Sequence, residues 1–167
     1  MAALGTLTLP LGAAARTVDS VTATAGSTAE IVYSGETLTV TNGVESTGNN
    51  ATGIRAVDDT EVAIGKDIYV HGANSQYNNS YGVYGDSGVQ VKVGTDIVVE
   101  SDAGAERVRG IYIDGGYGSS ISSTPDIQVG GNISASGINT IGIYVSGKNA
   151  NIKVDGNVTA SNRNATG

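Results

Sequence analysis

Short alternations of apolar and polar residues recur along this chain, separated by glycine, asparagine or aspartate. One block begins at Gly53 and holds three of them, at residues 54–56, 62–64 and 68–70. Period-2 alternation over about four residues, bounded by turn formers, is typical of short strands. No segment shows the period of about 3.6 that an amphipathic helix requires. The pattern therefore predicts a chain built of short strands.

The block repeats, each time with glycine followed by isoleucine or valine. Copies begin at Gly53, Gly82, Gly110 and Gly142, at steps of 29, 28 and 32 residues. A period of this size is typical of a solenoid, in which stacking buries apolar faces that one repeat cannot bury alone. We expect an all-β, right-handed parallel β-helix with three short strands per rung of about 25–32 residues. It would have about five rungs over residues 17–167.

Two parts of the chain fit the repeat less clearly. In the third copy we assign Ile121 and Ser123 to the second strand, and Ile127 and Val129 to the third. The residues between the third strand and the next glycine vary most in length, so we expect protruding loops there. These would be Gly72–Tyr81, Ser101–Arg109 and Gly130–Ile141.

Before Gly53 the repeat is degenerate. Ile31, Tyr33, Leu38 and Val40 alternate with polar residues, and we expect them to face the core. The segment Asn42–Thr52 is rich in Gly, Asn, Thr and Ser, which predicts a loop.

The N-terminal segment, residues 1–16, is apolar and uncharged up to its last residue. Small residues at Ala13–Ala15 resemble a signal-peptidase site, so the segment could be the remnant of a secretory signal. Alternatively, Leu7, Leu9 and Leu11 alternate with polar residues and proline, which indicates a strand that caps the first rung.

In a β-helix, equivalent residues of successive rungs form columns. If the isoleucine after each glycine points inward, the next residue points outward, which places Arg55, Tyr84, Tyr112 and Tyr144 in one exterior column. This is our candidate contact surface, because stacked tyrosines offer a flat platform for sugar rings. Alternatively, the rings only shield one another and the sheet. The glycines of the repeat are predicted to supply a corner conformation that other residues avoid.

Acidic and amide residues form a second column, Asp67, Asp96, Asp126 and Asn157. Asx residues favour turns because they bond to backbone groups. Carboxylates could instead bind Ca²⁺, but the glycine-rich nonapeptide of calcium-loaded β-rolls is absent. His71 is the only histidine, and we expect it to be solvent-exposed rather than catalytic.

Composition excludes several functions. The net charge of −7 argues against nucleic acid and anionic lipid as partners. The chain has no cysteine, and no stretch approaches the roughly 20 apolar residues that span a bilayer. No phosphate loop or nucleophile motif is present, so we expect no enzyme activity and no cofactor. The cluster Asp58, Asp59 and Glu61 leaves paired carboxylates for glycoside cleavage open.

The strings Gly-Ile-Tyr-Val at 142–145 and Asn-Ile-Lys-Val-Asp-Gly-Asn-Val-Thr-Ala at 151–160 resemble passenger domains of Gram-negative autotransporters and related surface adhesins. The resemblance covers residues 30–167 and rests on repeat style and composition. It implies a right-handed β-helix displayed on the bacterial surface, carried by a longer protein with its own membrane anchor.

We therefore expect an extracellular structural or adhesive module. Its partners would be glycans or proteins of host or neighbouring cells, or further copies that dock at exposed strand edges of the β-helix ends. The alternative is a β-helical polysaccharide lyase or glycoside hydrolase, for which Lys92 and Lys153 stand near equivalent strand positions. An ice-binding β-helix is less well supported, because Thr-x-Thr occurs only at 22–24 and 37–39 and does not follow the period.

Overall fold

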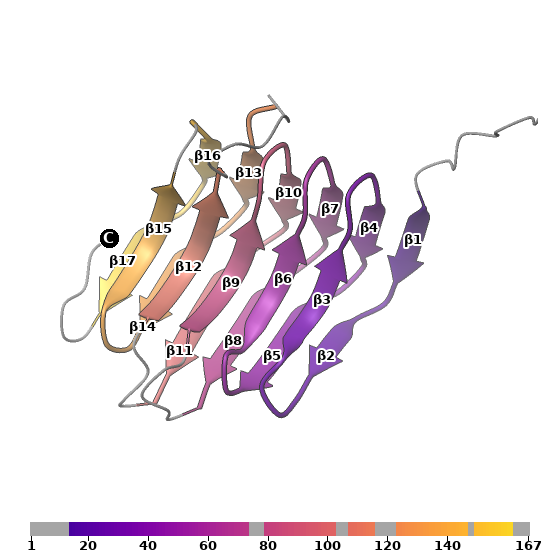
Figure 1. Cartoon of the computed structure of the whole chain (residues 1–167). Helices are drawn as coiled ribbons and strands as arrows, with labels where there is room; N and C mark the ends of the chain where they lie inside the picture. Colours follow the sequence, from indigo (N-terminus) through magenta and orange to yellow (C-terminus); the bar gives the residue numbers. More distant parts are fainter. Residues whose placement is uncertain (1–13, 74–78, 103–106, 116–122, 147–148, 162–167) are drawn as a thin grey trace, which may run out of the picture.

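The chain folds into a β-solenoid with three parallel sheets (Figure 1). The computed structural model describes residues 14–73, 79–102, 107–115, 123–146 and 149–161. Within these ranges the chain forms strands β1 to β17 and no helix. Among the same residues, no helix is long and apolar enough to cross a membrane.

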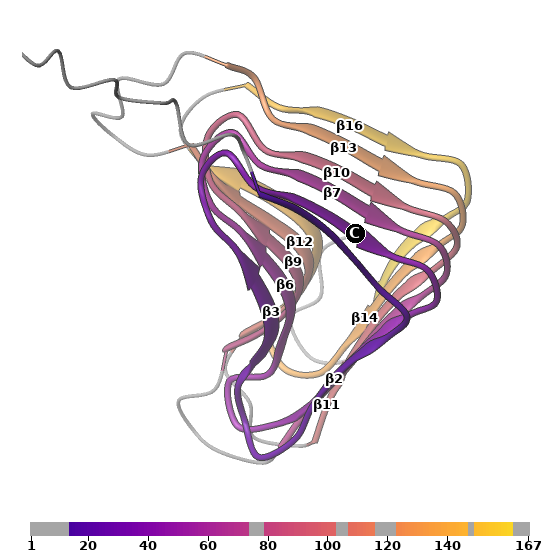
Figure 2. The ribbon, with the colours of Figure 1, turned by 90° about the vertical axis from the view of Figure 1, so that its right-hand side faces the viewer.

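Each sheet forms one side of the solenoid (Figure 2). Sheet A contains β1 (Ala15–Val18), β4 (Thr37–Val40), β7 (Glu61–Ile64), β10 (Gln90–Val93), β13 (Asp126–Val129) and β16 (Asn151–Val154). Sheet B contains β2 (Val21–Ala23), β5 (Val44–Gly48), β8 (Ile68–Gly72), β11 (Ile97–Ser101), β14 (Ile133–Ser136) and β17 (Val158–Ser161). Sheet C contains β3 (Thr28–Val32), β6 (Thr52–Ala56), β9 (Asn79–Gly85), β12 (Arg107–Asp114) and β15 (Thr140–Ser146).

The core consists of small branched side chains stacked in columns. Val62 aligns with Val91, and Val91 with Ile127, and all three are at most 2% exposed. The apolar residues of the described core are only Val, Ile, Leu and Ala. Such side chains fit a thin layer in which strands of successive rungs lie about 4.8 Å apart. The predicted three-strand parallel fold is confirmed.

The third repeat has a different register from the one that the sequence predicts. Ile127 and Val129 lie in β13 of sheet A, the second strand of the repeat, and not in the third. The third strand is β14, where Ile133 and Ala135 are buried, so residues 130–141 are not a loop. Ser123 is exposed rather than in a core position, and Ile121 lies outside the described residues.

The N-terminal rungs also differ from the prediction. Val32 is fully buried and aligns with Ala56, whereas Ile31 aligns with the outward Arg55 and Tyr33 is 60% exposed. A shift of one residue in a period-2 pattern exchanges the two faces of a strand. Leu38 and Val40 face the core as predicted.

The polar segment 42–52 is not a loop either, because it contains β5. Ser46 occupies a core column in line with Val70, and its hydroxyl donates a hydrogen bond to the Ser27 carbonyl at 2.7 Å. A satisfied hydroxyl can stand at a buried position, which is why the polar composition was misleading.

The first described strand, β1, begins at Ala15 and pairs with β4. The predicted signal remnant or capping strand, with Leu7, Leu9 and Leu11, lies outside the described residues. So do the central residues of two predicted loops, 74–78 and 103–106.

The repeated glycines lie within the strands of sheet C rather than at a corner, and none has a positive φ. They are needed because of close approach: a Cβ on Gly53 would lie 2.5 Å from Ile68 Cγ2 and 2.6 Å from the Gly82 carbonyl oxygen. These glycines face the core, and they are skipped in the pairing between neighbouring strands. Each therefore acts like a bulge, which resets the inward–outward alternation.

Candidate functional site

The predicted exterior column exists on the outer face of sheet C. Arg55 aligns with Tyr84, Tyr84 with Tyr112, and Tyr112 with Tyr144. The structure adds a second column, because Tyr81 of β9 aligns with Arg109 of β12 three residues before the first column. We call these six residues the tyrosine–arginine face: Arg55, Tyr81, Tyr84, Arg109, Tyr112 and Tyr144.

Tyr81 and Arg109 could not be found by alternation alone. In strict alternation, residues 80 and 82 would share the outer face with Tyr84. Alternation therefore predicts that Tyr81 faces the core. Gly82 resets the alternation, so that Tyr81 and Tyr84 share the outer face with ring centroids 5.4 Å apart. The same reset at Gly110 places Arg109 and Tyr112 together. The sequence does carry an indication of this second column, because Tyr81 directly precedes Gly82 and Arg109 directly precedes Gly110.

The rings of this face contact one another in a continuous chain. The centroid separations are 5.0 Å for Tyr84–Tyr112 and 5.2 Å for Tyr112–Tyr144, and the latter pair is stacked with an interplanar angle of 7°. Tyr81 lies 5.4 Å from both Tyr84 and Tyr112. Aromatic pairs at such distances stabilise each other beyond the area they bury. The face is thus ordered before any ligand arrives.

Two arginines lie against these rings. Arg55 Cζ is 5.3 Å from the Tyr84 centroid. Arg109 Cζ is 4.6 Å from the Tyr112 centroid, 4.7 Å from that of Tyr144 and 5.8 Å from that of Tyr81. A guanidinium within about 6 Å of an aromatic face is attracted by the ring quadrupole. None of the ion pairs between described residues involves either arginine.

Carboxylates lie at the other end of the same strands. Asp86 directly follows β9, and Asp114 ends β12. Burial, followed by the charges of Asp86 and Asp114, raises the pKa of the Tyr84 phenol to about 12. Burial also raises the pKa of Tyr112, and that of the Asp86 carboxyl. The phenols of Tyr84 and Tyr112 are therefore neutral at physiological pH. Along β12 the charge on this side of the sheet changes from basic at Arg109 to acidic at Asp114.

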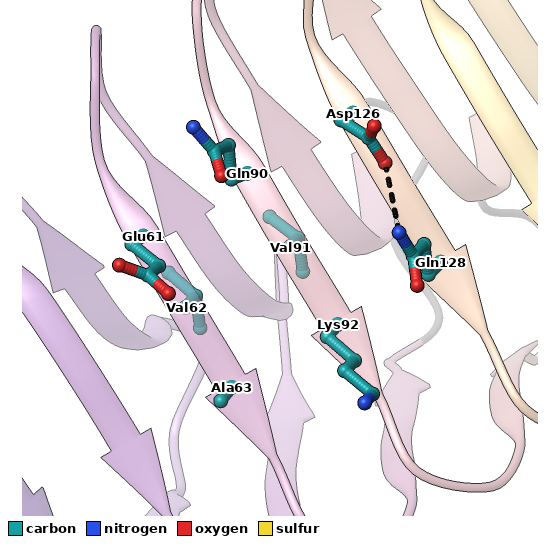
Figure 3. Close-up of a pocket in the computed structure, with 8 residues that line it drawn as sticks. All are labelled: Glu61, Val62, Ala63, Gln90, Val91, Lys92, Asp126 and Gln128. Atoms are coloured by element: carbon teal, nitrogen blue, oxygen red, sulfur yellow. Dashed lines mark hydrogen bonds between the residues drawn. The ribbon is translucent and has the colours of Figure 1, made fainter.

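A second surface feature lies on the outer face of sheet A. Side chains of β7, β10 and β13 line a pocket there, with Glu61, Gln90, Lys92, Asp126 and Gln128 pointing outward (Figure 3). Gln128 Nε2 donates a hydrogen bond to Asp126 Oδ1 at 3.4 Å.

The two lysines of the depolymerase hypothesis do occupy equivalent positions. Lys92 aligns with Gln128, and Gln128 aligns with Lys153. Lys153 Nζ lies 2.8 Å from Asp155 Oδ1, so this lysine is already paired with a carboxylate. Lys92 is therefore the lysine of this pair that lines the pocket with Glu61 and Asp126.

The Asx column differs from its prediction at one member. Asp126 lies in β13, in line with Gln90, and its predicted place in the column belongs to Asn132. Asp96 Oδ1 accepts hydrogen bonds from Asn132 N at 2.6 Å and Asn132 Nδ2 at 3.2 Å. Asn132 Oδ1 in turn accepts one from Asn157 N at 2.9 Å. These side chains join successive rungs, and their structural role accounts for the column.

The described residues contain no candidate metal site, and His71 is the only histidine of the sequence. No group of three or more His, Cys, Asp or Glu side chains among the described residues could hold a metal ion. The His71 side chain is 39% exposed, with Nε2 3.4 Å from Asp102 Oδ1 and Nδ1 3.9 Å from Glu100 Oε2. The histidine is partly solvent-exposed, in agreement with the prediction.

The chain was compared with protein-family models, curated proteins and solved structures, and none of them matches it.

Proposed function

We propose that this chain is an extracellular adhesive module, displayed on a bacterial surface as part of a longer autotransporter-like protein. The tyrosine–arginine face is its contact surface. The observation that carries the proposal is the unbroken series of four tyrosine rings on one side of the solenoid. Exposed aromatic side chains gathered in one patch are typical of binding surfaces.

The partners that fit this face are glycans or proteins of host or neighbouring cells. A tyrosine ring presents a flat apolar surface, and the C–H groups of a pyranose ring can stack on such a surface. Tyr144 keeps 37% of its surface exposed, so its ring remains available to a ligand. The solenoid suits this task because its rigid backbone holds the rings in register.

Self-association through the solenoid ends is part of the same proposal. Val145 aligns with the fully buried Ile113, yet it is 40% exposed. It lies in β15, at one edge of sheet C. Within the described residues β15 pairs only with β12, and a strand edge of this kind can pair with a further strand, from this chain or from another copy.

An adhesion assay tests the proposed contact surface. Beads coated with the chain are incubated with cultured epithelial cells, and bound beads are counted. Replacing Tyr112 and Tyr144 together by alanine should reduce binding severalfold. Tyr33→Ala is the matched control, because Tyr33 is 60% exposed and lies outside the face. Equal binding by all three proteins would show that the face is not the contact surface.

The second candidate function is polysaccharide cleavage, favoured by the pocket on sheet A. Glu61 and Asp126 lie on β7 and β13 with β10 between them, so their Cα atoms are about two strand spacings, ~9.6 Å, apart. Two carboxylates on one groove could serve as the acid and base of a glycoside hydrolase. New reducing ends released from a polysaccharide, and lost in Glu61→Gln and Asp126→Asn, would establish this function. If the unmodified chain releases no reducing ends, polysaccharide cleavage is ruled out and adhesion remains the proposed function.

A further inference from the structure

Arg109 is an unusual residue for the position it occupies. It is half-buried, and its Nε is buried without a hydrogen-bond partner. Buried guanidinium groups are normally hydrogen-bonded or paired with a carboxylate, because an uncompensated buried donor is costly. Arg109 has neither kind of partner among the described residues. Its guanidinium lies against the rings of Tyr81, Tyr112 and Tyr144.

This environment orients the Arg109 guanidinium without supplying an anionic partner from the described residues. The rings fix the plane of the guanidinium but provide no anion. A guanidinium presents several N–H donors in a rigid fork that matches a carboxylate. The side chain is thus arranged to receive a planar anion from outside the molecule.

Basic residues are few in this chain, and sheets A and C carry three each. Arg16 and Lys153 of sheet A are paired with Glu30 and Asp155, whereas no ion pair between described residues involves Arg55, Arg107 or Arg109 of sheet C. Arg107 and Arg109 stand two residues apart on β12, hence on the same face. A shallow pocket beside Arg55 is lined by Thr28, Thr52, Tyr81 and Tyr84. The face therefore offers cationic groups both on β6 and on β12.

The carboxylates beyond the tyrosines set an orientation. Asp86 and Asp114 lie towards the C-terminal ends of β9 and β12, whereas Arg109 lies before the tyrosines. An anionic ligand is repelled from the first side and attracted to the second. Its carboxylate would therefore lie at Arg109 and its ring over Tyr144, which is 37% exposed.

We propose that the tyrosine–arginine face binds an acidic polysaccharide built from uronic acids, with a ring carboxylate on Arg109 and the sugar ring stacked on Tyr144. This inference rests on the proposed adhesive function and names the ligand class of the same face.

Binding is measured by biolayer interferometry against immobilised polygalacturonate, alginate, hyaluronan, dextran sulfate and neutral dextran. The full chain should bind at least one of the three uronate polymers and should bind dextran weakly. Methyl esterification of the bound polymer should abolish binding, because it removes the charge and keeps the ring. Binding should also weaken as salt is added.

Variants assign the interaction to Arg109. Arg109→Gln should weaken binding about tenfold or more, since it removes a charge-assisted bidentate contact. Arg109→Lys should recover only part of the affinity, because the planar fork is lost. Lys66→Gln is the control: it removes one positive charge from an exposed turn between β7 and β8, outside the face, and should change the affinity less than about threefold. Thermal melting checks that each variant is folded.

The outcomes separate this inference from the proposed function. Failure to bind any uronate polymer, equal binding to dextran, or full binding by a folded Arg109→Gln variant would overturn the uronate inference. Binding to dextran sulfate but to no uronate polymer would show that the face recognises sulfate and not carboxylate, and would also overturn the uronate inference. In each case the bead assay with the double tyrosine variant still decides whether the face mediates adhesion.

Discussion

Within the tyrosine–arginine face, Tyr84 has the most strongly raised pKa. It contacts Tyr81 edge-on, Tyr112 at 5.0 Å and the Arg55 guanidinium at 5.3 Å. Burial and the nearby carboxylates disfavour its phenolate. The register of Tyr84 could be predicted from the repeated glycine. Its contact with Tyr81 could not, because that depends on how the backbone passes Gly82.

Alkaline titration tests the environment of Tyr84. Its pKa of about 12 exceeds the value near 10 of an unfolded tyrosine. The folded state thus holds this proton more tightly, and the corresponding stability is present below about pH 10 and lost as the pH rises towards 12. Phenolate absorbance should show several tyrosines that titrate later than an unfolded tyrosine, and the last of them should disappear in Tyr84→Phe. Titration of every tyrosine together near pH 10 would contradict this environment.

At the scale of the strands, the repeat predicted the sheets, and local resemblance misled the register. Asp126-Ile127-Gln128-Val129 looks like Asp67-Ile68-Tyr69-Val70, which is a third strand of its repeat. It nevertheless pairs with β10, and the third-strand position goes to Ile133 after Asn132. The deciding interactions are between rungs: Asn132 bonds to Asp96, which lies 36 residues earlier. A single sequence does not show such a pairing.

The Asx column gives a direct test of this register. Asp96→Ala removes the acceptor of two hydrogen bonds from Asn132, so it should lower the free energy of unfolding by about 0.5–1.5 kcal/mol. Asp126→Ala should change it by less than about 0.5 kcal/mol, because only a long bond from Gln128 is lost. Urea denaturation measures both. The reverse order of effects would support the register predicted from sequence.

For the whole molecule, stability depends on stacking between neighbouring rungs. In a solenoid each repeat contacts only its neighbours, so end rungs are held less firmly than central ones. The exposed fraction follows this rule: core-facing Ile113 is fully buried, and its neighbour Val145 in β15 is 40% exposed. The sequence predicted the column that contains both residues. It did not predict their different burial, which depends on the position of the strand within the sheet.

Two alanine substitutions, one in β12 and one in β15, measure how stability differs between these rungs. Ile113→Ala should lower the free energy of unfolding by about 2–5 kcal/mol, because it leaves a cavity in a packed layer. Val145→Ala should lower it by less than about 1 kcal/mol, since that side chain is already partly hydrated. Amide hydrogen exchange should likewise be slower in β8 and β11 than in β17. Uniform protection and equal costs would show that the rungs do not behave as a stacked array.

The central claim is that the outer face of sheet C is the surface through which this module contacts its ligand. NMR chemical-shift mapping of the isotope-labelled chain, titrated with oligogalacturonate, tests this claim most directly. We predict shifts at the backbone amides of β9, β12 and β15 and at the tyrosine rings, and clearly smaller shifts at the same ligand concentration in the Arg109→Gln variant. Shifts confined to Glu61, Lys92 and Asp126 on sheet A would contradict the claim.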